Sequence, residues 1–465
     1  MMTLEKEKIC ISIIIPVYNV EKYVSYCLKS VLPQTNDMVE VIVIDDGSTD
    51  GSKKVCENIL SQGKLNIKFL HQENAGLSST RNRGIDMANG EYIMFLDSDD
   101  ELNLNAVQVL AESAKNHPDV DVFYFDAATV DEINDGQSRN KYNRKNKISG
   151  PAVFDAEEYF SEYYVDTHIV SACLCMIKRE VLIANNIKFD EERLYEDNAF
   201  SLNLLLCSQK VCYLPYDLYV RRYRENSITT SKISEKNVKD ACYVLERFIE
   251  MKNQVLAMNS QQACNAFLAE IYKIYFWAEN MMLEAGMILE CVSNTKSELI
   301  RALWEWPEKY KNCSYYFFIY TMVKGRAYNF IDNDYVKEKL NECYFKLLEE
   351  IQVDEDKRIA IYGRGKHTRL LLEMYEYMTG RELEFDVYAD TYKENGYTED
   401  GKKIVNIADI EKCADVIVVS SFVYRLEMLK TIRDLNLGIE VIDFYDIEKM
   451  NLFDERPDFL GVLYG

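Results

Sequence analysis

The chain has 465 residues, more than a single hydrophobic core usually serves, so we expect two or three domains. Its formal net charge is −23, and so large an acidic excess argues against a nucleic-acid partner. No apolar run reaches the roughly 20 residues that a membrane-spanning helix needs, so the sequence predicts no transmembrane segment.

The cysteines and the N-terminus bear on the compartment. The 13 cysteines lack the spacing of a zinc site, and reduced thiols in a cytoplasm are the simplest interpretation. The chain enters an apolar stretch almost at once, which argues against a signal peptide. We therefore expect a cytoplasmic protein. A place at the inner face of the membrane is left open, because the basic stretch 139–147 could contact anionic lipid or could be a solvated loop.

Apolar runs alternate with amphipathic segments in the N-terminal part of the chain. Strands are predicted at residues 11–15, 39–44 and 67–72, and each is followed by a helix, at residues 21–31, 52–60 and 78–87. This alternation is typical of an α/β fold with a parallel sheet covered on both faces. Such sheets bind ligands outside the carboxyl ends of their strands, so the residues that follow each strand are site candidates.

Two aspartates follow a fourth apolar run, which ends near Leu96. In an extended segment, side chains two residues apart point the same way, so Asp97 and Asp99 could face one divalent cation together. Carboxylates suit Mg²⁺ or Mn²⁺, and a site with one or two of them leaves the other positions to water and substrate phosphates. The sequence therefore predicts a metal-assisted nucleotide diphosphate site, with a plain acidic turn as the alternative.

Four stretches together carry a resemblance to a known family. Residues 12–19, 43–50, 74–82 and 95–100 resemble, in this order, the successive motifs of family 2 glycosyltransferases, which have the GT-A nucleotide-sugar fold. The resemblance spans about half of the chain. It implies an inverting transferase that takes a sugar from a nucleotide-activated donor, most often UDP-linked, with Mn²⁺ or Mg²⁺ as cofactor.

The resemblance also implies roles for single residues on the donor side. The nucleotide would be bound by Pro16, Tyr18, Asn19, Asp46, Asn74 and Gly76. The Asp46 carboxylate would accept a hydrogen bond from the base, although capping of the helix that starts near Ser52 would also explain an aspartate there. Asp97 and Ser98 would lie near the ribose or the metal, and Asp97 and Asp99 would be metal ligands, with Asp99 the direct one.

Farther along, Glu196 and Asp197 resemble the family's Glu-Asp pair, whose aspartate takes the proton from the acceptor hydroxyl. An inverting transfer needs a carboxylate base on the acceptor side and positive charge on the leaving-group side. Asp197 is therefore expected to be the catalytic base, with Glu196 beside the substrate. Both residues could also begin a helix, where the helix dipole favours acidic side chains, and the two interpretations are compatible.

Three arginines lie in the stretch 219–229, which resembles the arginine segment that closes the family's domain. Arginine is a bidentate partner for phosphate, so this segment would approach the pyrophosphate. Arg222 and Arg224 are the expected contacts. A basic surface strand is the alternative interpretation.

The pattern changes after residue 233. We predict a GT-A domain over 1–233, a helical domain over 234–350 and a small Rossmann-like α/β domain over 351–465. The last begins with a strand and a turn containing Gly363 and Gly365, with Asp386 or Asp390 at the distance of a ribose-binding acid. Thr368 stands where a dinucleotide fingerprint has its third glycine, so whether this domain binds a ligand is left open.

The residues and the resemblance favour one function. We expect an inverting, metal-dependent glycosyltransferase that moves a sugar from a nucleotide-sugar, with UDP as the favoured nucleotide, to a hydroxyl acceptor in glycan or surface polysaccharide biosynthesis. The acceptor would be a lipid-linked glycan or a protein. The alternative is a non-catalytic protein that binds sugar nucleotides or acts as a scaffold.

Overall fold

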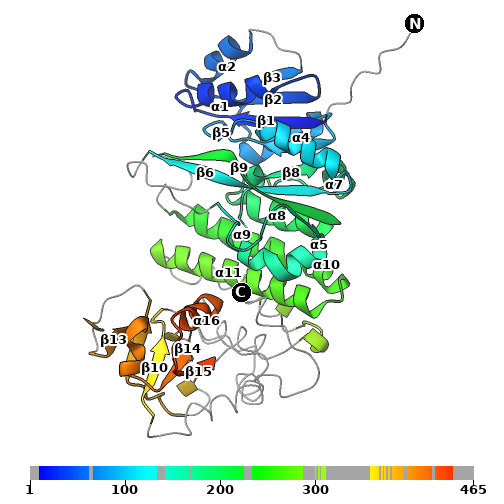
Figure 1. Cartoon of the computed structure of the whole chain (residues 1–465). Helices are drawn as coiled ribbons and strands as arrows, with labels where there is room; N and C mark the ends of the chain where they lie inside the picture. Colours follow the sequence, from blue (N-terminus) through cyan, green and yellow to red (C-terminus); the bar gives the residue numbers. More distant parts are fainter. Residues whose placement is uncertain are drawn as a thin grey trace. The chain divides into compact units, whose positions relative to one another are not determined.

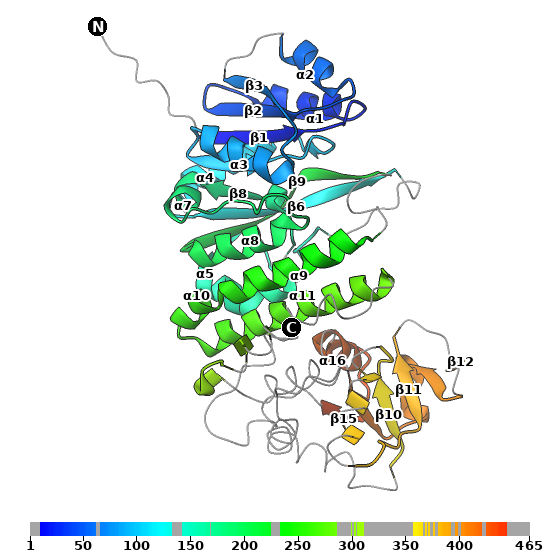
Figure 2. The ribbon, with the colours of Figure 1, turned by 180° about the vertical axis from the view of Figure 1, so that it is seen from behind.

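The structure is a computed structural model that divides into two compact units (Figures 1 and 2). Residues 1–258 with 274–289 form the first, and residues 259–273 with 290–465 form the second. The described residues are 10–61, 66–132, 142–167, 169–224, 233–285, 299, 302–303, 305–310, 357–365, 368–369, 371–372, 375–376, 380–391, 396–398, 401–420 and 425–443.

The first unit is built on one large sheet in the order β3-β2-β1-β4-β8-β6-β9-β5, with β7 beside β9. The strands are β1 (Ile11–Val17), β2 (Val39–Asp46), β3 (Ile67–Gln72), β4 (Tyr92–Phe95), β5 (Glu101–Leu102), β6 (Val122–Asp131), β7 (Ala152–Asp155), β8 (Cys175–Lys178) and β9 (Lys210–Tyr223). β1 pairs in parallel with both β2 and β4, and β2 with β3. The chain order thus reverses between β1 and β4, which is where open α/β sheets bind ligands.

Helices connect the parallel strands as the sequence predicts. They are α1 (Val24–Val31), α2 (Ser52–Leu60) and α3 (Leu77–Met87). The first begins at Val24 rather than at residue 21, because residues 21–23 form a turn closed by a bond from the Tyr23 amide to the Val20 carbonyl (2.8 Å). α3 lies unusually close to the sheet: a Cβ atom on Gly84 would be only 2.4 Å from Ile14 Cγ2.

The first unit contains further helices, which come after β5 in the chain. They are α4 (Ala106–Asn116), α7 (Arg179–Ala184), α8 (Glu196–Cys207), α9 (Glu235–Glu250) and α10 (Lys252–Ala257), with short helical turns α5 (Ala156–Glu158), η2 (Tyr159–Tyr164), α6 (Val165–Thr167) and η3 (Ala172–Leu174). α9 buries Val238, Cys242, Leu245 and Phe248, which share one face of the helix. Both α9 and α10 belong to the same compact unit as the sheet. The predicted domain boundary at residue 233 stays a prediction.

The basic stretch 139–147 is only partly a surface loop. Residues 139–141 lie outside the described residues. The Arg144 side chain is 2% exposed and donates hydrogen bonds to the carbonyls of Thr167 (3.0 Å) and Phe125 (2.8 Å). Arg144 therefore serves the packing of the sheet and is not available to a membrane surface. None of the helices in the described ranges is long and apolar enough to cross a bilayer.

The second unit contains a smaller sheet in the order β12-β13-β11-β10-β14-β15. The strands are β10 (Ile359–Tyr362), β11 (Val387–Asp390), β12 (Gly396–Tyr397), β13 (Lys403–Asn406), β14 (Val416–Val419) and β15 (Glu440–Asp443), and the helices are η5 (Glu308–Tyr310), η6 (Ile407–Lys412) and α16 (Arg425–Asp434). Helix α11 (Gln261–Glu284) begins in this unit and ends in the first. Pairing is parallel except between β12 and β13. The first strand, β10, lies inside the sheet, which agrees with an α/β unit; its kinship to Rossmann domains stays a prediction.

Candidate functional site

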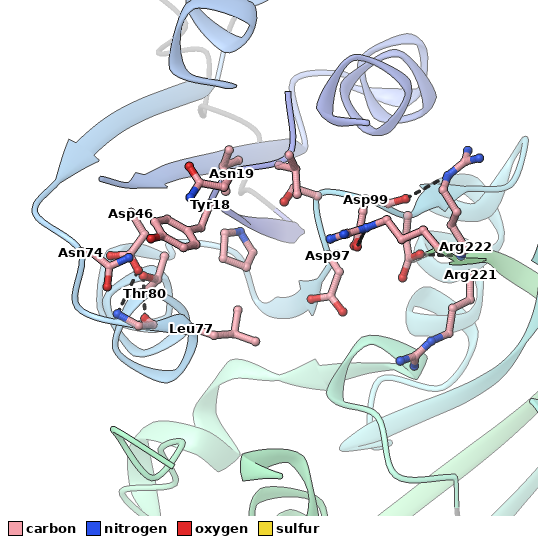
Figure 3. A pocket seen from close by; sticks show the side chains of 17 residues that line it. Tyr18, Asn19, Asp46, Asn74, Leu77, Thr80, Asp97, Asp99, Arg221 and Arg222 are labelled. Carbon is pink, nitrogen blue, oxygen red and sulfur yellow. Dashed lines mark hydrogen bonds and ion pairs between the residues drawn. The ribbon is translucent and has the colours of Figure 1, made fainter. Parts of the chain in front are cut away.

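A pocket of about 530 Å³ opens at the carboxyl ends of β1, β2 and β4 (Figure 3). Of the predicted site residues it is lined by Pro16, Tyr18, Asn19, Asp46, Asn74, Gly76, Asp97, Ser98, Asp99, Arg222 and Arg224. Val17, Val20, Leu77, Thr80, Asp100 and Arg221 also line it, and the sequence analysis did not select them. Glu196 and Asp197 are not among the lining residues and join the site in another way, described below.

One wall of the pocket is formed by the loops that follow β1 and β2. The Asn19 backbone is in the left-handed region (φ 50°), and its side-chain oxygen accepts a hydrogen bond from the Thr49 amide (2.8 Å). The Asn19 amide donates to Ser48 Oγ (3.1 Å). These bonds tie the two loops together and leave the neighbouring Tyr18 ring 48% exposed at the pocket.

Asp46 organises the loop that follows β3. Its carboxylate accepts hydrogen bonds from Gln72 Nε2 (2.7 Å) and from the amides of Ala75 and Gly76 (both 2.9 Å). Gly76 has a φ of 87°, a conformation that side chains rarely permit, so glycine suits this position. Capping of α2 by Asp46 is wrong as an explanation, because Asp50 is the carboxylate that accepts from the Ser52 amide (2.9 Å).

The acidic segment after β4 is a turn and not an extended strand. β4 ends at Phe95, and the Asp100 amide donates to the Asp97 carbonyl (3.0 Å). The predicted geometry, in which Asp97 and Asp99 point the same way because they alternate on a strand, is therefore wrong. Asp97 Oδ1 accepts from Arg81 (2.8 Å), whereas Asp99 Oδ2 accepts from Arg224 Nε (2.8 Å). Both carboxylates nevertheless line the same pocket.

These carboxylates carry more negative charge than their surroundings neutralise. Burial and the neighbouring Asp97 raise the pKa of Asp99 above its ordinary value. Burial, Asp99 and Asp97 together raise the pKa of Asp100 to about 8. Burial alone would raise the pKa of Asp97 as well, but Arg81 and Arg221 hold it below its ordinary value. A bound cation would relieve this excess of charge.

The donor atoms at this turn fit Mg²⁺ or Mn²⁺. Asp97 and Asp99 offer carboxylate oxygens, the hard ligands that these ions prefer, and both face space in which water and phosphate oxygens could complete an octahedral shell. Among the described residues, no three or more His, Cys, Asp or Glu side chains form a cluster able to hold a metal by themselves. The turn thus suits a cation held jointly with a substrate better than a resident structural metal.

The three arginines at the end of β9 have different environments. Arg222 is paired with Glu101 (2.6 Å) and Glu132 (2.5 Å), and Arg224 is paired with Asp99. The Arg221 guanidinium lies over the Tyr142 ring, 4.9 Å from its centroid, and makes no hydrogen bond or ion pair with any residue that the structure describes. Figure 3 shows Arg221 on the side of the pocket where Asp97 lies.

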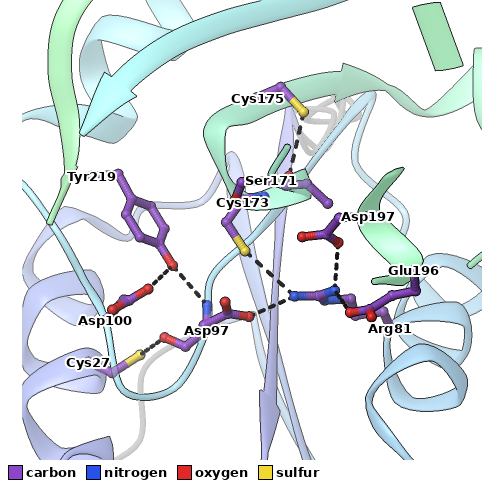
Figure 4. A network of polar contacts seen from close by, with 11 residues as sticks. Cys27, Arg81, Asp97, Asp100, Ser171, Cys173, Cys175, Glu196, Asp197 and Tyr219 are labelled. Carbon is purple, nitrogen blue, oxygen red and sulfur yellow. Dashed lines mark hydrogen bonds and ion pairs between the residues drawn. The ribbon is translucent and has the colours of Figure 1, made fainter. Parts of the chain in front are cut away.

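Arg81 connects the acidic turn to the predicted catalytic base (Figure 4). This side chain on α3 is 2% exposed. Its Nη1 atom donates to Glu196 Oε1 (2.8 Å) and Asp197 Oδ1 (3.0 Å), and its Nη2 atom donates to Asp97 Oδ1. The structure thus brings Asp97 together with Glu196 and Asp197, the first two residues of α8. Burial and Asp197 raise the pKa of Glu196 to about 7 even though Arg81 opposes the shift.

Arg81 is not among the residues predicted from the sequence, although it stands in the stretch 74–82 that carries the resemblance. A signal was present in the sequence, since Arg81 stands four residues from both Leu77 and Ile85, on the apolar face of its helix, where a charged side chain needs a counter-ion. Its neighbour Asn82 was missed too. The Asn82 side chain accepts from the Phe189 amide and donates to the Phe189 carbonyl (both 2.9 Å), and so fixes the segment that leads to α8.

The glycine turn of the second unit is closed by its own polar groups. The φ of Gly363 is 104°, as a glycine turn requires. Thr368 Oγ1 is hydrogen-bonded to Ser420 Oγ (2.8 Å), and Arg364 Nε donates to Asp390 Oδ2 (3.1 Å). Asp386 accepts from the Ile359 amide (2.7 Å) at the opposite end of the strands. Of the two candidate acids, only Asp390 therefore stands at the carboxyl edge.

Comparison with known proteins adds to this geometry. Residues 12–184 match the family model described as Glycosyl transferase family 2. Glycosyltransferase GlyA of Streptococcus pneumoniae is 31% identical over 223 residues, which are 47% of this chain and 31% of that protein. Minor teichoic acid biosynthesis protein GgaB of Bacillus subtilis is 29% identical over 235 residues, 49% of this chain and 24% of that protein. The chain thus spans a third or less of the length of these two relatives.

Among solved structures, S. aureus TarS resembles the chain with a TM-score of 0.51 at 20% identity, covering 72% of this chain and 55% of that one. At this level of identity the likeness concerns the fold. It confirms the expected α/β architecture with a GT-A-like sheet.

Proposed function

We propose that the chain is a glycosyltransferase that moves a sugar from a nucleotide-sugar donor to a hydroxyl group of an acceptor glycan. One observation carries the proposal: through Arg81, the acidic turn after β4 and the carboxylates that begin α8 form a single site at the sheet edge. The match of residues 12–184 to a glycosyltransferase family model supports the proposal for Arg81 and the acidic turn, and Glu196 and Asp197 follow the matched residues in the chain.

The donor would occupy the pocket. The exposed Tyr18 ring offers a flat apolar surface to a nucleobase, and the loop that Asp46 organises shapes the wall beside it. Arg221, which lines the pocket together with Asp97, offers charged donors to a diphosphate. A Mg²⁺ or Mn²⁺ ion held by Asp97 and Asp99 would supply positive charge to the departing phosphate. We propose UDP as the nucleotide, following the resemblance in the motifs.

The acceptor would approach from α8. Asp197 would take the proton from the acceptor hydroxyl while the hydroxyl oxygen attacks the anomeric carbon on the face opposite to the leaving diphosphate, and the configuration at that carbon inverts. Arg81 would keep Asp197 at a fixed distance from Asp97 and so from the donor. One relative is named for teichoic acid biosynthesis, which supports a surface polysaccharide as the acceptor class.

Nucleotide binding is the first test. Calorimetry with UDP and Mn²⁺ should give binding to the wild-type chain that depends on the metal, and Asp99→Ala should abolish it. Asp119→Ala is the matched control, because Asp119 is an exposed aspartate paired with Lys210 and lies outside the pocket. Unchanged UDP affinity in Asp99→Ala would remove Asp99 from the metal site.

Turnover is the second test, with release of UDP from UDP-glucose, UDP-galactose and UDP-N-acetylglucosamine as the probe. Asp197→Asn keeps the shape of the side chain but removes its basicity, so UDP should still bind while turnover falls by about 10²–10⁴, the usual contribution of a general base. Near-normal turnover by Asp197→Asn would exclude this base. Metal-dependent UDP binding without turnover of any sugar nucleotide would favour the non-catalytic alternative.

A further inference from the structure

A six-residue segment, 190–195, leads directly into Glu196 and Asp197 and is held by helix α9. Lys236 Nζ donates to the Glu192 carbonyl (2.8 Å), and Arg247 Nε donates to Asp190 Oδ2 (3.0 Å). The Arg193 guanidinium lies over the Tyr243 ring, 4.2 Å from its centroid. The segment is thus fastened to one helix along its length and not only at its ends.

Asp240 is the central anchor. This residue of α9 is 1% exposed, and its Oδ2 atom accepts from the Leu194 amide (3.0 Å) and from Lys236 Nζ (3.0 Å). Its Oδ1 atom accepts from Arg193 Nη1 (3.1 Å). A buried carboxylate is costly unless it is paired in this way, and its removal would leave the Leu194 amide and two cations without their partner.

The last residue of the segment has a backbone conformation that needs support. Tyr195 has a φ of 64°, in the left-handed region that side chains other than Gly, Asn and Asp rarely adopt. Its hydroxyl accepts from Asn237 Nδ2 (2.8 Å), and its ring meets the Trp277 ring edge to face at a centroid distance of 4.6 Å. Because α8 begins at the next residue, this conformation sets the direction in which Glu196 and Asp197 leave the segment.

From these contacts we propose that Asp240 is a positioning residue for the transfer: it acts through the segment 190–195 to hold Asp197 against the acceptor hydroxyl. The inference rests on the proposed function, because it needs Asp197 to be the base. Helix α9 then belongs to the catalytic apparatus, although it contributes no residue to the pocket. A base displaced by about 1 Å can cost as much as roughly 100-fold in rate, so a remote anchor of this kind has a measurable effect.

The test uses the full-length chain, with UDP and Mn²⁺ for binding and release of UDP from the UDP-hexoses for turnover. Asp240→Ala should lower kcat by about 10–100-fold and leave the affinity for UDP within about twofold, because the segment contributes no residue to the lining of the pocket. Asp240→Asn keeps one acceptor for the Leu194 amide and should recover part of the loss. Glu235→Gln is the matched control, since it changes one charge on the same helix at an exposed pair with Lys239.

A double-mutant cycle separates positioning from general destabilisation. If Asp240 acts through Asp197, adding Asp240→Ala to Asp197→Asn should lower turnover by less than about twofold further, since the base is already lost. Hydrogen exchange should also speed up in residues 189–197 of Asp240→Ala and stay unchanged in β1 to β3. Equal losses in both backgrounds, or unchanged exchange in residues 189–197, would overturn the positioning role.

The two proposals fail in different ways. If Asp197→Asn impairs turnover and Asp240→Ala does not, the positioning role is wrong and the proposed function stands. If Asp197→Asn itself turns over normally, the base assignment is wrong and the positioning role falls with it.

Discussion

The two sheets of this chain differ at the carboxyl ends of their parallel strands. At the first, Asp97, Asp99 and Arg221 line a pocket of about 530 Å³, and burial together with the neighbouring Asp97 raises the pKa of Asp99 although Asp99 is paired with Arg224. At the second, Arg364 is paired with Asp390, and Thr368 is hydrogen-bonded to Ser420. Both edges have a turn that requires glycine, at Gly76 and at Gly363. A glycine turn at the end of a strand is therefore not enough to mark a site.

The first edge differs from the second because several charged side chains line a pocket there. The raised pKa values of Asp99 and Asp100 record an arrangement that is unfavourable without a ligand, and such arrangements are typical of functional sites. The contacts at the second edge satisfy one another and leave no such imbalance among the residues described there. The predictions that follow test this difference, beginning with the largest effect.

Arg221→Ala should weaken the binding of UDP in the presence of Mn²⁺ by about 10–100-fold, because a charge-assisted hydrogen bond contributes about 1.5–3 kcal/mol. Uridine lacks the diphosphate, so its affinity should not change. Calorimetry with both compounds is the measurement, and Arg222→Ala is the control because Arg222 is already paired with Glu101 and Glu132. A larger loss in Arg222→Ala than in Arg221→Ala would restore the sequence-based choice of Arg222.

Asp100 should make stability depend on pH in the absence of a cation. Its pKa is about 8 in the folded chain and about 3.9 when unfolded. Between these values the folded state keeps a proton that the unfolded state has released, so the free energy of unfolding falls as pH rises through this window. Asp100→Asn removes the titration. From pH 5 to pH 9 in EDTA, the wild-type Tm should therefore drop more than that of Asp100→Asn.

Each pKa unit corresponds to about 1.4 kcal/mol, and 1 kcal/mol moves the Tm of a domain of this size by roughly 2–4 °C. The difference between the two proteins should thus be several degrees. Added Mg²⁺ should reduce it, because a cation at the turn favours the ionised carboxylate. Parallel pH curves for the two proteins would show that Asp100 is ionised throughout.

Arg364→Ala should have the smallest effect. The Arg364 and Asp390 side chains keep 21% and 18% of their surface in contact with water, and an ion pair that water can screen contributes about 0–1 kcal/mol. UDP affinity and the release of UDP from UDP-hexoses should be unchanged, with at most a small decrease in Tm. A fall in either binding or turnover would mean that the second edge takes part in the reaction, and the contrast between the two edges would then be lost.

The strands and helices at the start of the first unit lie close to their predicted positions, because each is formed by a pattern of neighbouring residues. The strands predicted at 39–44 and 67–72 are found at Val39–Asp46 and Ile67–Gln72, and the helix predicted at 52–60 is found at Ser52–Leu60. The motifs also located most of the pocket, since strand ends in a parallel sheet meet at one edge. Local patterns left open whether the acidic segment extends or turns after Phe95, and in the structure the Tyr219 hydroxyl of β9 donates to Asp100 at this turn (2.8 Å).

Long-range pairings account for what was missed. Arg81 and Asp197 are far apart in the sequence, and only the folded chain brings them within 3.0 Å. The choice among the three arginines of β9 likewise depends on which of them find acidic partners on other elements. Asp240 belongs to a helix that the sequence placed in a separate domain, so its contact with the Leu194 amide had no counterpart in any motif.

Gly84 shows how the depth of one helix controls both sides of the site. Gly84 has no side chain, so α3 packs directly against Ile14 of β1. Arg81 lies one turn before Gly84 on the same helix, and this close packing brings its guanidinium to the carboxylates. A methyl group at this position would act as a spacer between helix and sheet. It would move Arg81 away from both Asp97 and Asp197. The absence of a side chain at Gly84 therefore fixes the position of the Arg81 guanidinium.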